Sequence, residues 1–141
     1  MAMTVRVDIV SAEGAIHSGL ATMVYATAEM GEVGIAPRHT AFISRLKPGD
    51  VRVENEQGEQ EHFYVSGGML EVQPNVVTVL ADTAIRARDL DEAAAMEAKR
   101  RAEDALAGQT AKFEYAKAQV ELAEAVAQLR AIEKLRKMKG R

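Results

Sequence analysis

The fold is decided within residues 76–102, VVTVLADTAIRARDLDEAAAMEAKRRA, where one kind of sequence pattern gives way to another. The stretch Val76–Ala81 is rich in β-branched residues and predicts a strand, which we expect to be the most buried of its sheet. From Asp89 onward the residues are good helix formers, and Asp89 stands three residues before Glu92, as the N-cap residue of a capping box does. The sequence therefore predicts a β-sheet domain over residues 1–87 and a helical part over residues 88–141.

Earlier in the chain, short apolar alternations separated by turns predict further strands. Val5, Val7 and Ile9 follow the period of two that is typical of a strand with one buried face, and Val51 and Val53 repeat it. All three prolines and eight of the ten glycines lie in residues 1–87, so the turn-forming residues are concentrated there. Short strands separated by turns, with no helical period between them, favour an antiparallel sandwich or small barrel over a βαβ fold.

The helical part divides into two helices. The first is predicted to begin at Asp89 and to stop at Gly108, and the second to run from about Ala111 to Met138. Because three residues separate them, the helices must fold back on each other as an antiparallel hairpin. The apolar positions expected on the first helix are Leu90, Ala93, Ala94, Ala98, Ala102, Ala105 and Leu106. Those expected on the second are one line of Phe113, Ala116, Val120, Ala123 and Ala127, and another of Leu122, Val126, Leu129, Ile132 and Leu135.

The helical part is unusually rich in alanine, with fourteen alanines among the 53 residues after Arg88. Burying one methylene contributes about 0.8 kcal/mol, whereas burying a whole large aliphatic side chain contributes roughly 1.5–3 kcal/mol. Alanine also favours the helix intrinsically, so each helix can persist when the two part. Strong helices with weak mutual contacts suit a movable arm, and the alternative is a static hairpin docked on the sheet.

Charge also differs between the two parts. Residues 1–88 carry seven Lys and Arg against eleven Asp and Glu, whereas residues 89–141 carry eleven against ten. The last fourteen residues hold six basic residues and one acidic residue, Glu133. This basic tip is either a solvated helix end that complements the helix dipole or a surface that docks onto an acidic protein.

The residue content disfavours most catalytic sites. The chain has no cysteine and its three histidines are widely spaced, so neither a thiolate nucleophile nor a compact metal site is expected. Ser66 lies in a Ser-Gly-Gly segment, but Tyr64 stands where a nucleophile elbow needs glycine. One interpretation of this segment is a catalytic triad of Ser66 with His39 and Asp82. We favour the other, in which the two glycines permit a sharp turn of the backbone.

Phosphate, nucleic-acid and membrane sites are not predicted either. Gly31, Gly34 and the Gly67–Gly68 pair are not followed by the Lys-Ser/Thr of a P-loop. The net charge of −3 gives no general attraction for nucleic acid. Aromatic residues make up only 4% of the chain, so no stacking platform for single-stranded nucleic acid is expected. No apolar run is long enough to predict a secretory or membrane-spanning segment.

Several segments in order resemble the epsilon subunits of F-type ATP synthases. They are Gly31-Glu32-Val33-Gly34-Ile35, His39, Leu46-Lys47-Pro48-Gly49, Val65–Val72, Val77–Ala84 and Asp89–Ala93. The resemblance spans the whole chain and implies a sandwich of about ten strands followed by a two-helix hairpin. It further implies a non-catalytic subunit of the central rotor, which binds the gamma subunit and the c-ring and takes part in proton-driven ATP synthesis. Such a subunit lies peripherally at the cytoplasmic face of the inner (plasma) membrane, without inserting into it.

The resemblance also implies roles for individual residues. Glu32, in a loop flanked by glycines, matches the region that faces the c-ring, and His39 and Ser44 match positions near gamma. The hairpin of this family can extend along gamma into the alpha/beta catalytic hexamer and inhibit ATP hydrolysis. Acidic segments of those subunits are the partners expected for four residues of the basic tip, Arg130, Lys134, Arg136 and Lys137.

Some family members bind ATP in the hairpin through the motif Ile/Leu-Asp-x-x-Arg-Ala. Leu90, Asp91 and Ala95 match its ends here, but Ala94 replaces the arginine, so the cationic contact that a nucleotide favours is missing. We therefore expect no cofactor. The remaining rival interpretations are a free-standing nucleotide-sensing module and a hydrolase that uses Ser66.

Overall fold

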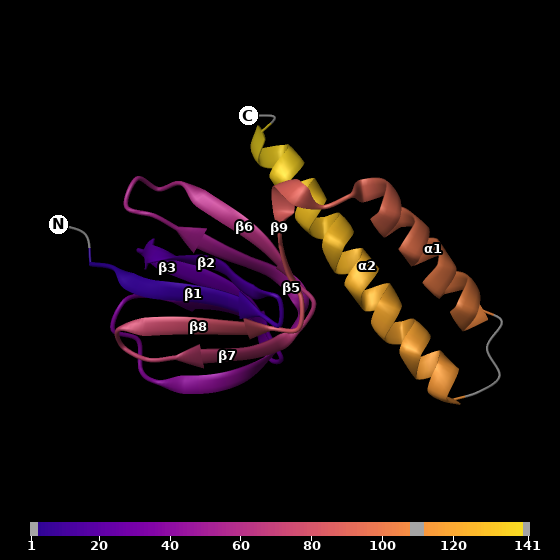
Figure 1. Cartoon of the computed structure of the whole chain (residues 1–141), viewed down its shortest axis with the longest axis horizontal. Helices are drawn as coiled ribbons and strands as arrows, with labels where there is room; N and C mark the ends of the chain where they lie inside the picture. The colour runs from indigo at the N-terminus through magenta and orange to yellow at the C-terminus, as the bar shows by residue number, and fades with distance from the viewer. Residues whose placement is uncertain (1–2, 108–111, 140–141) are drawn as a thin grey trace. The chain divides into compact units, whose positions relative to one another are not determined.

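The computed structural model describes residues 3–107 and 112–139, and the chain divides into two compact units, Met1–Arg86 and Ala87–Arg141. The first unit holds the strands, and the second holds a short 3-10 turn, Ala87–Asp89, and two helices, α1 (Glu92–Ala107) and α2 (Lys112–Lys139) (Figure 1). The strands are β1 (Val5–Ser11), β2 (Gly14–Ala21), β3 (Met23–Ala28), β4 (Gly31–Ile35), β5 (Phe42–Glu54), β6 (Gln60–Val65), β7 (Gly68–Val72), β8 (Val76–Ala81) and β9 (Ala84–Arg86). The expected sandwich followed by a hairpin is confirmed, with nine strands in the described residues.

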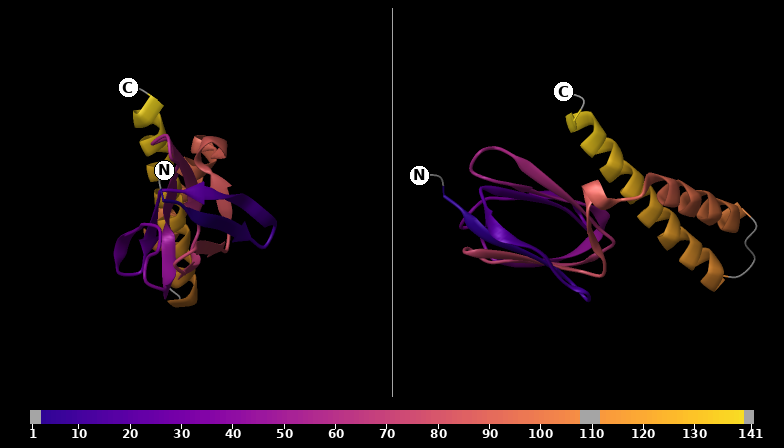
Figure 2. Two further views of the ribbon diagram at one scale, coloured as in Figure 1. Left: turned by 90° about the vertical axis from the view of Figure 1, so that its left-hand side faces the viewer. Right: turned by 45° about the horizontal axis from the view of Figure 1, so that its top comes forward.

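Strand β5 joins the two layers of the sandwich. Its first half, from Phe42 to Leu46, pairs with β7, and its second half, from Gly49 to Glu54, pairs with β6. One layer continues from β7 through β8 and β1 to β2, and the other holds β4, β3, β6 and β9. The layers face each other in the right-hand view of Figure 2. Strands β1 and β8 run parallel, whereas the other strand pairs of the described residues are antiparallel, as expected.

The core lies between these layers and follows the predicted alternation. In β1, the side chains of Val5, Val7 and Ile9 are buried while Arg6 is exposed. Val51 and Val53 of β5 are buried in the same cluster, so both predicted alternations are confirmed. Each fully buried aliphatic side chain of this cluster stabilises the fold by roughly 1.5–3 kcal/mol.

The expectation that Val76–Ala81 is the most buried strand is wrong. Strand β8 alternates, and the side chain of Leu80 is 56% exposed. Strand β6 instead ends in four consecutive buried residues, His62–Val65. The β-branched run of β8 therefore reflects strand propensity rather than burial of both faces.

The Gly67–Gly68 pair forms a tight approach between the start of β7 and the end of β8. Gly68 has a φ of +141°, and a Cβ at this position would lie 2.1 Å from the carbonyl oxygen of Leu80. The N–H of Asp82 donates to the carbonyl oxygen of Gly67 across this approach at 2.9 Å. Glycine is thus required here for space as well as for conformation.

Replacing Gly68 by alanine tests this requirement. The added Cβ meets rigid backbone, so we expect Gly68→Ala to lower the free energy of unfolding by about 3 kcal/mol or more. Gly14→Ala is the matched control, because Gly14 has a φ of +125° but open space around its Cβ position. It should cost only about 1–2 kcal/mol of conformational strain. Urea unfolding of the two variants measures the difference, and equal losses would contradict the steric explanation.

A polar cluster joins β2 and β9, each of which pairs with a single neighbouring strand. The guanidinium of Arg86 donates to the carbonyl oxygen of Ile16 at 2.8 Å, forms an ion pair with Glu61 and lies 5.2 Å from the ring centroid of Phe63. His17 Nδ1 lies 3.5 Å from a carboxylate oxygen of Glu61. These contacts bind β2, β6 and β9 together, so they close the sandwich along one side.

Burial lowers the pKa of His17; the Glu61 carboxylate opposes this shift and Arg86 adds to it. An unfolded histidine has a pKa of about 6.5. As the pH falls below about 6.5, the unfolded chain binds a proton that folded His17 resists, so the free energy of unfolding should fall until the pH passes the lowered folded pKa.

His17→Gln should flatten the decline of stability below about pH 6.5, because it removes the titrating ring. His39→Gln is the control, since His39 lies outside this cluster. Urea unfolding of the isolated chain at a series of pH values provides the measurement. A His17→Gln variant with the same pH slope as the parent would contradict the assignment.

The first helix begins two residues later than predicted. The side-chain oxygen of Asp91 accepts the N–H of Ala94 at 3.1 Å, and the carbonyl oxygen of Asp91 accepts the N–H of Ala95 at 3.0 Å. Asp91 is therefore the N-cap, whereas Asp89 closes the 3-10 turn. Both aspartates precede helix formers, and the sequence favoured Asp89 because Glu92 follows it at capping-box spacing. Only the local hydrogen bonds distinguish the two.

The two helices lie side by side and antiparallel (Figures 1 and 2). Alanines spaced seven residues apart are buried in each helix, Ala95 and Ala102 in α1 and Ala118 and Ala125 in α2. This alanine seam is flanked by half-buried Leu122, Leu129 and Ile132 of α2. A seven-residue repeat keeps the same helix face toward its partner over several turns.

Other positions of the predicted stripes are not buried. Ala93, Ala94 and Ala105 of the first helix and Ala116, Val120 and Ala123 of the second are exposed. Gly108, Ala111 and the side chain of Phe113 lie outside the described residues. Within residues 3–107 and 112–139, no helix combines the length and the apolar character needed to cross a membrane.

Candidate functional site

Glu32 was expected in a loop, but it lies in strand β4. The two flanking glycines resemble a turn, but residues Gly31–Ile35 pair with β3 along their whole length. Among the described strands β4 pairs with β3 alone, so it is an edge strand of the sheet. The side chain of Glu32 is 51% exposed on this edge.

The Glu32 carboxylate forms an ion pair with Arg52 of β5. Arg52 is directly opposite Tyr25 of β3, and its guanidinium lies 4.6 Å from the centroid of the Tyr25 ring. Arg52 Nε also lies 3.8 Å from a carboxylate oxygen of Asp50. A partner at this edge would therefore meet a carboxylate that is already fixed and partly neutralised. Sequence analysis missed Arg52 because strand register is not visible in an isolated alternation.

His39 and Ser44 are both held by local contacts. His39 Nδ1 donates to the carbonyl oxygen of Thr40 at 2.8 Å, and its ring lies 5.4 Å from that of Phe42. The Ser44 hydroxyl donates to the carbonyl oxygen of Arg45 at 3.1 Å. Both residues are half-buried. No hydrogen bond or ion pair of the described residues joins them to Glu32, so the structure leaves the three positions as separate elements of the surface.

Ser66, His39 and Asp82 do not assemble as a triad. Gly68 of β7 pairs with Leu46 of β5, whereas Val72 at the other end of β7 pairs with Phe42. Ser66 precedes β7, and His39 precedes the Phe42 end of β5. At roughly 3.3 Å per strand residue, the length of β7 alone separates them by about 13 Å. The Ser66 hydroxyl instead accepts the N–H of Thr83 at 2.9 Å, which is a structural role.

The basic tip places its four described side chains on two faces of α2. Arg130, Lys134 and Lys137 share one face at helical spacing, and Arg136 points about 120° away from Arg130 because successive residues turn by about 100°. All four are exposed. Lys137 pairs with Glu133 on its own helix at 3.4 Å, whereas Arg136 pairs with Glu92 of α1. Arg141 and the side chain of Lys139 lie outside the described residues.

The residues that match the nucleotide motif have structural roles within the hairpin. Asp91 caps α1, and the side chain of Ala95 is 1% exposed in the alanine seam. Leu90 is half-buried, and its N–H donates to the carbonyl oxygen of Ala87 at 3.2 Å. Ala94, where the motif has arginine, is exposed and contributes no charge.

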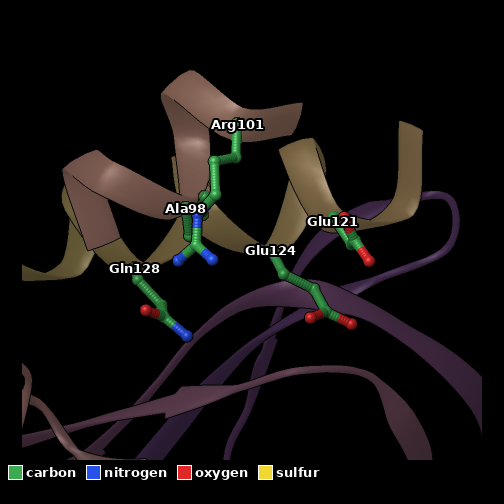
Figure 3. Close-up of a pocket in the computed structure, with 6 residues that line it drawn as sticks. Ala98, Arg101, Glu121, Glu124 and Gln128 are labelled. Carbon is green, nitrogen blue, oxygen red and sulfur yellow. The ribbon is translucent and has the colours of Figure 1, made fainter. Parts of the chain in front are cut away.

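A groove of about 300 Å³ lies between the helices on one side of the hairpin. Arg101 of α1 projects toward α2 beside Gln128, and the two carboxylates of the groove, Glu121 and Glu124, also come from α2 (Figure 3). One cation against two carboxylates disfavours an anionic ligand such as a nucleotide. Within the described residues, no three His, Asp or Glu side chains come together as a metal site.

Both units match known sequence families. A family described as "ATP synthase, Delta/Epsilon chain, beta-sandwich domain" matches residues 4–87, and one described as "ATP synthase, Delta/Epsilon chain, long alpha-helix domain" matches residues 88–133. The chain belongs to the ATP synthase delta/epsilon family. Its relatives include the ATP synthase epsilon chain of Nitrosococcus oceani, 64% identical over 99% of this chain and 100% of the relative. The epsilon chain of Thioalkalivibrio sulfidiphilus is 65% identical over 97% of this chain and 98% of its own length.

Chains of two solved structures share the fold. A chain of the structure "Cryo-EM structure of Euglena gracilis mitochondrial ATP synthase, OSCP/F1/c-ring in rotational state 1" matches with a TM-score of 0.82 at 19% identity, over 92% of this chain and 81% of its own. A chain of the Tetrahymena thermophila mitochondrial ATP synthase central stalk/c-ring structure matches with a TM-score of 0.61 at 13% identity, over 92% and 97%. The sandwich and hairpin thus persist at low sequence identity.

The arrangement of Asp91, Ala94 and Ala95 predicts that the isolated chain does not bind ATP at low concentration. Isothermal titration calorimetry with ATP and Mg²⁺ should show no saturation with a dissociation constant below about 1 mM, an affinity of only about −4 kcal/mol. Ala94→Arg is the informative comparison, because it restores the cation of the motif at an exposed position. Saturable micromolar binding by the unchanged chain would contradict the prediction.

Proposed function

We propose that this chain is the epsilon subunit, a non-catalytic part of the central rotor, of a proton-translocating F-type ATP synthase. In this role the sandwich binds gamma and the c-ring, and the helical hairpin inhibits ATP hydrolysis by the alpha/beta hexamer. The observation that carries the proposal is the match of both units to the delta/epsilon family, with epsilon-chain relatives covered along nearly their whole length. The complex would hold the chain at the cytoplasmic face of the inner membrane, as a peripheral subunit.

The sandwich is suited to a fixed coupling. Eighteen buried residues form one apolar cluster, and the contacts of Arg86 close the side between β2 and β9. A closed sandwich of this kind resists shear, because moving one strand breaks ladder hydrogen bonds and core packing together. Glu32, His39 and Ser44 are candidate contacts on its surface, and the Arg52 ion pair would keep the Glu32 carboxylate in one position.

The hairpin is suited to a moving part. The fully buried residues of its seam are alanines and the flanking Leu122, Leu129 and Ile132 are only half-buried, so parting the helices exposes less apolar surface than parting a fully buried leucine seam would. The ion pairs of Lys99 with Glu103 and of Arg100 with Glu97 lie within α1 and survive separation. Each helix thus keeps its own stabilising contacts when the pair opens, which is what a change between two arrangements requires.

The basic tip supplies a means of binding in the open arrangement. Arg130, Lys134 and Lys137 form one exposed cationic face near the end of α2. Acidic segments of the catalytic subunits would attract this face, and the attraction would decline as salt screens it over about 8–10 Å.

Removing the hairpin tests the proposed function. In a reconstituted complex, a chain ending at Ala87 should still assemble with gamma and the c-ring, because its core lies within the sandwich. ATP hydrolysis should rise relative to the complex with the full chain, because the inhibitory arm is absent. Ser66→Ala in the full chain is the control and should leave hydrolysis unchanged. Loss of assembly with a correctly folded sandwich, or no rise in hydrolysis, would refute the corresponding half of the proposal.

A further inference from the structure

One ion pair spans the open end of the hairpin. Glu92 is the first residue of α1, and Arg136 lies three residues before the end of α2. Their side chains pair although 44 positions separate them in the sequence. The chain connects the helices at the opposite end, between Ala107 and Lys112, so the Glu92–Arg136 pair lies where two separating helices move farthest apart. We call this pair the clasp.

The surroundings make the clasp easy to break. A groove of about 600 Å³ lies beside it, lined by Glu92, Met96, Leu129, Glu133, Arg136 and Lys137. The side chains of Arg136 and Glu92 are 66% and 43% exposed, so water and salt reach both charges. An exposed pair of this kind contributes little to stability, so little free energy is needed to separate its two charges.

The clasp differs from neighbouring ion pairs in what opening does to it. Lys137 and Glu133 are four residues apart on α2 and stay together when the helices part. Arg136 and Glu92 belong to different helices, so opening must separate them. Arg136 also belongs to the basic tip that is proposed to reach an acidic partner. Arg136 Nη2 donates to a carboxylate oxygen of Glu92, and an N–H group engaged in this way is not available to a second carboxylate.

We propose that Glu92 is an internal competitor for Arg136: it holds the hairpin closed and withholds this cation from the acidic partner of the tip. The inference rests on the proposed function, since the partner is the one assigned to the tip there. Salt then acts twice, because it weakens the clasp and so favours opening, while it also weakens the attraction between tip and partner. The dependence of inhibition on salt is therefore smaller in the intact chain than in a chain without the clasp.

The first experiment measures opening in the isolated chain. The protein has no cysteine, so spin labels can be placed on Ala94→Cys and Met138→Cys, which are exposed positions near the two ends of the clasp. Electron double-resonance distances should show the separated population rising about two- to fivefold in Glu92→Gln and equally in Arg136→Gln. The control Glu133→Gln should leave the distances unchanged. Unchanged distances in Glu92→Gln would overturn the clasp.

The second experiment measures ATP hydrolysis in the reconstituted complex. Glu92→Gln should strengthen inhibition about two- to fivefold, because it frees Arg136, and should increase its sensitivity to salt. Arg136→Gln should weaken inhibition, because it opens the hairpin but removes a partner contact. If the ion pair were purely structural, inhibition of ATP hydrolysis would change in the same direction in both variants, and that result would overturn the proposed competition. If truncation at Ala87 leaves hydrolysis unchanged while Glu92→Gln still opens the isolated hairpin, the proposed function fails and the clasp stands.

Discussion

The second unit depends on the packing of α1 against α2 through alanine methyl groups. Ala95 and Ala102 face α2, and Ala118 and Ala125 recur at the same seven-residue spacing in the other helix. Small side chains at a helix contact let the axes approach closely, but each methyl group contributes only about 0.8 kcal/mol. The seam therefore fixes how the helices meet without binding them strongly. Charged residues at the open end consequently have an influence here that they would lack beside a leucine core.

The sandwich is stabilised in a different way. Its core consists mainly of valine, isoleucine, leucine and phenylalanine side chains, with four alanines among its eighteen residues, and two close approaches lock its strands. Gly68 meets the backbone of β8, and Arg86 joins β9 to the backbone of β2. Partial opening of such a unit would expose large side chains and break several hydrogen bonds at once. A tightly packed sandwich and a loosely held helix pair thus give one chain two mechanical characters.

Sequence patterns predicted the elements well where residue size or shape is decisive. Alternating valines identify β1 and the second half of β5, and the glycine pair at the start of β7 marks a tight approach. The pattern was uninformative where alanine dominates, because alanine is compatible with either a buried or an exposed helix face. The predicted apolar stripe therefore included Ala94, which is exposed, and left out Ala95, which is buried. Partners brought together by register or by helix pairing, such as Arg52 with Glu32 and Arg136 with Glu92, leave no local trace in the sequence.

The proposed dual use of Arg136 depends on the same weakness of the seam. An exposed ion pair contributes at most about 1 kcal/mol, which is negligible against a core but changes a nearly balanced equilibrium about fivefold. A ligand shifts a two-state equilibrium only by its difference in affinity for the two states. An acidic surface that binds Arg136 gains that difference directly, because the closed hairpin already engages this guanidinium with Glu92. Under the proposed mechanism, the strength of the closed state and the strength of partner binding are therefore coupled through a single side chain, so a change at Glu92 alters both.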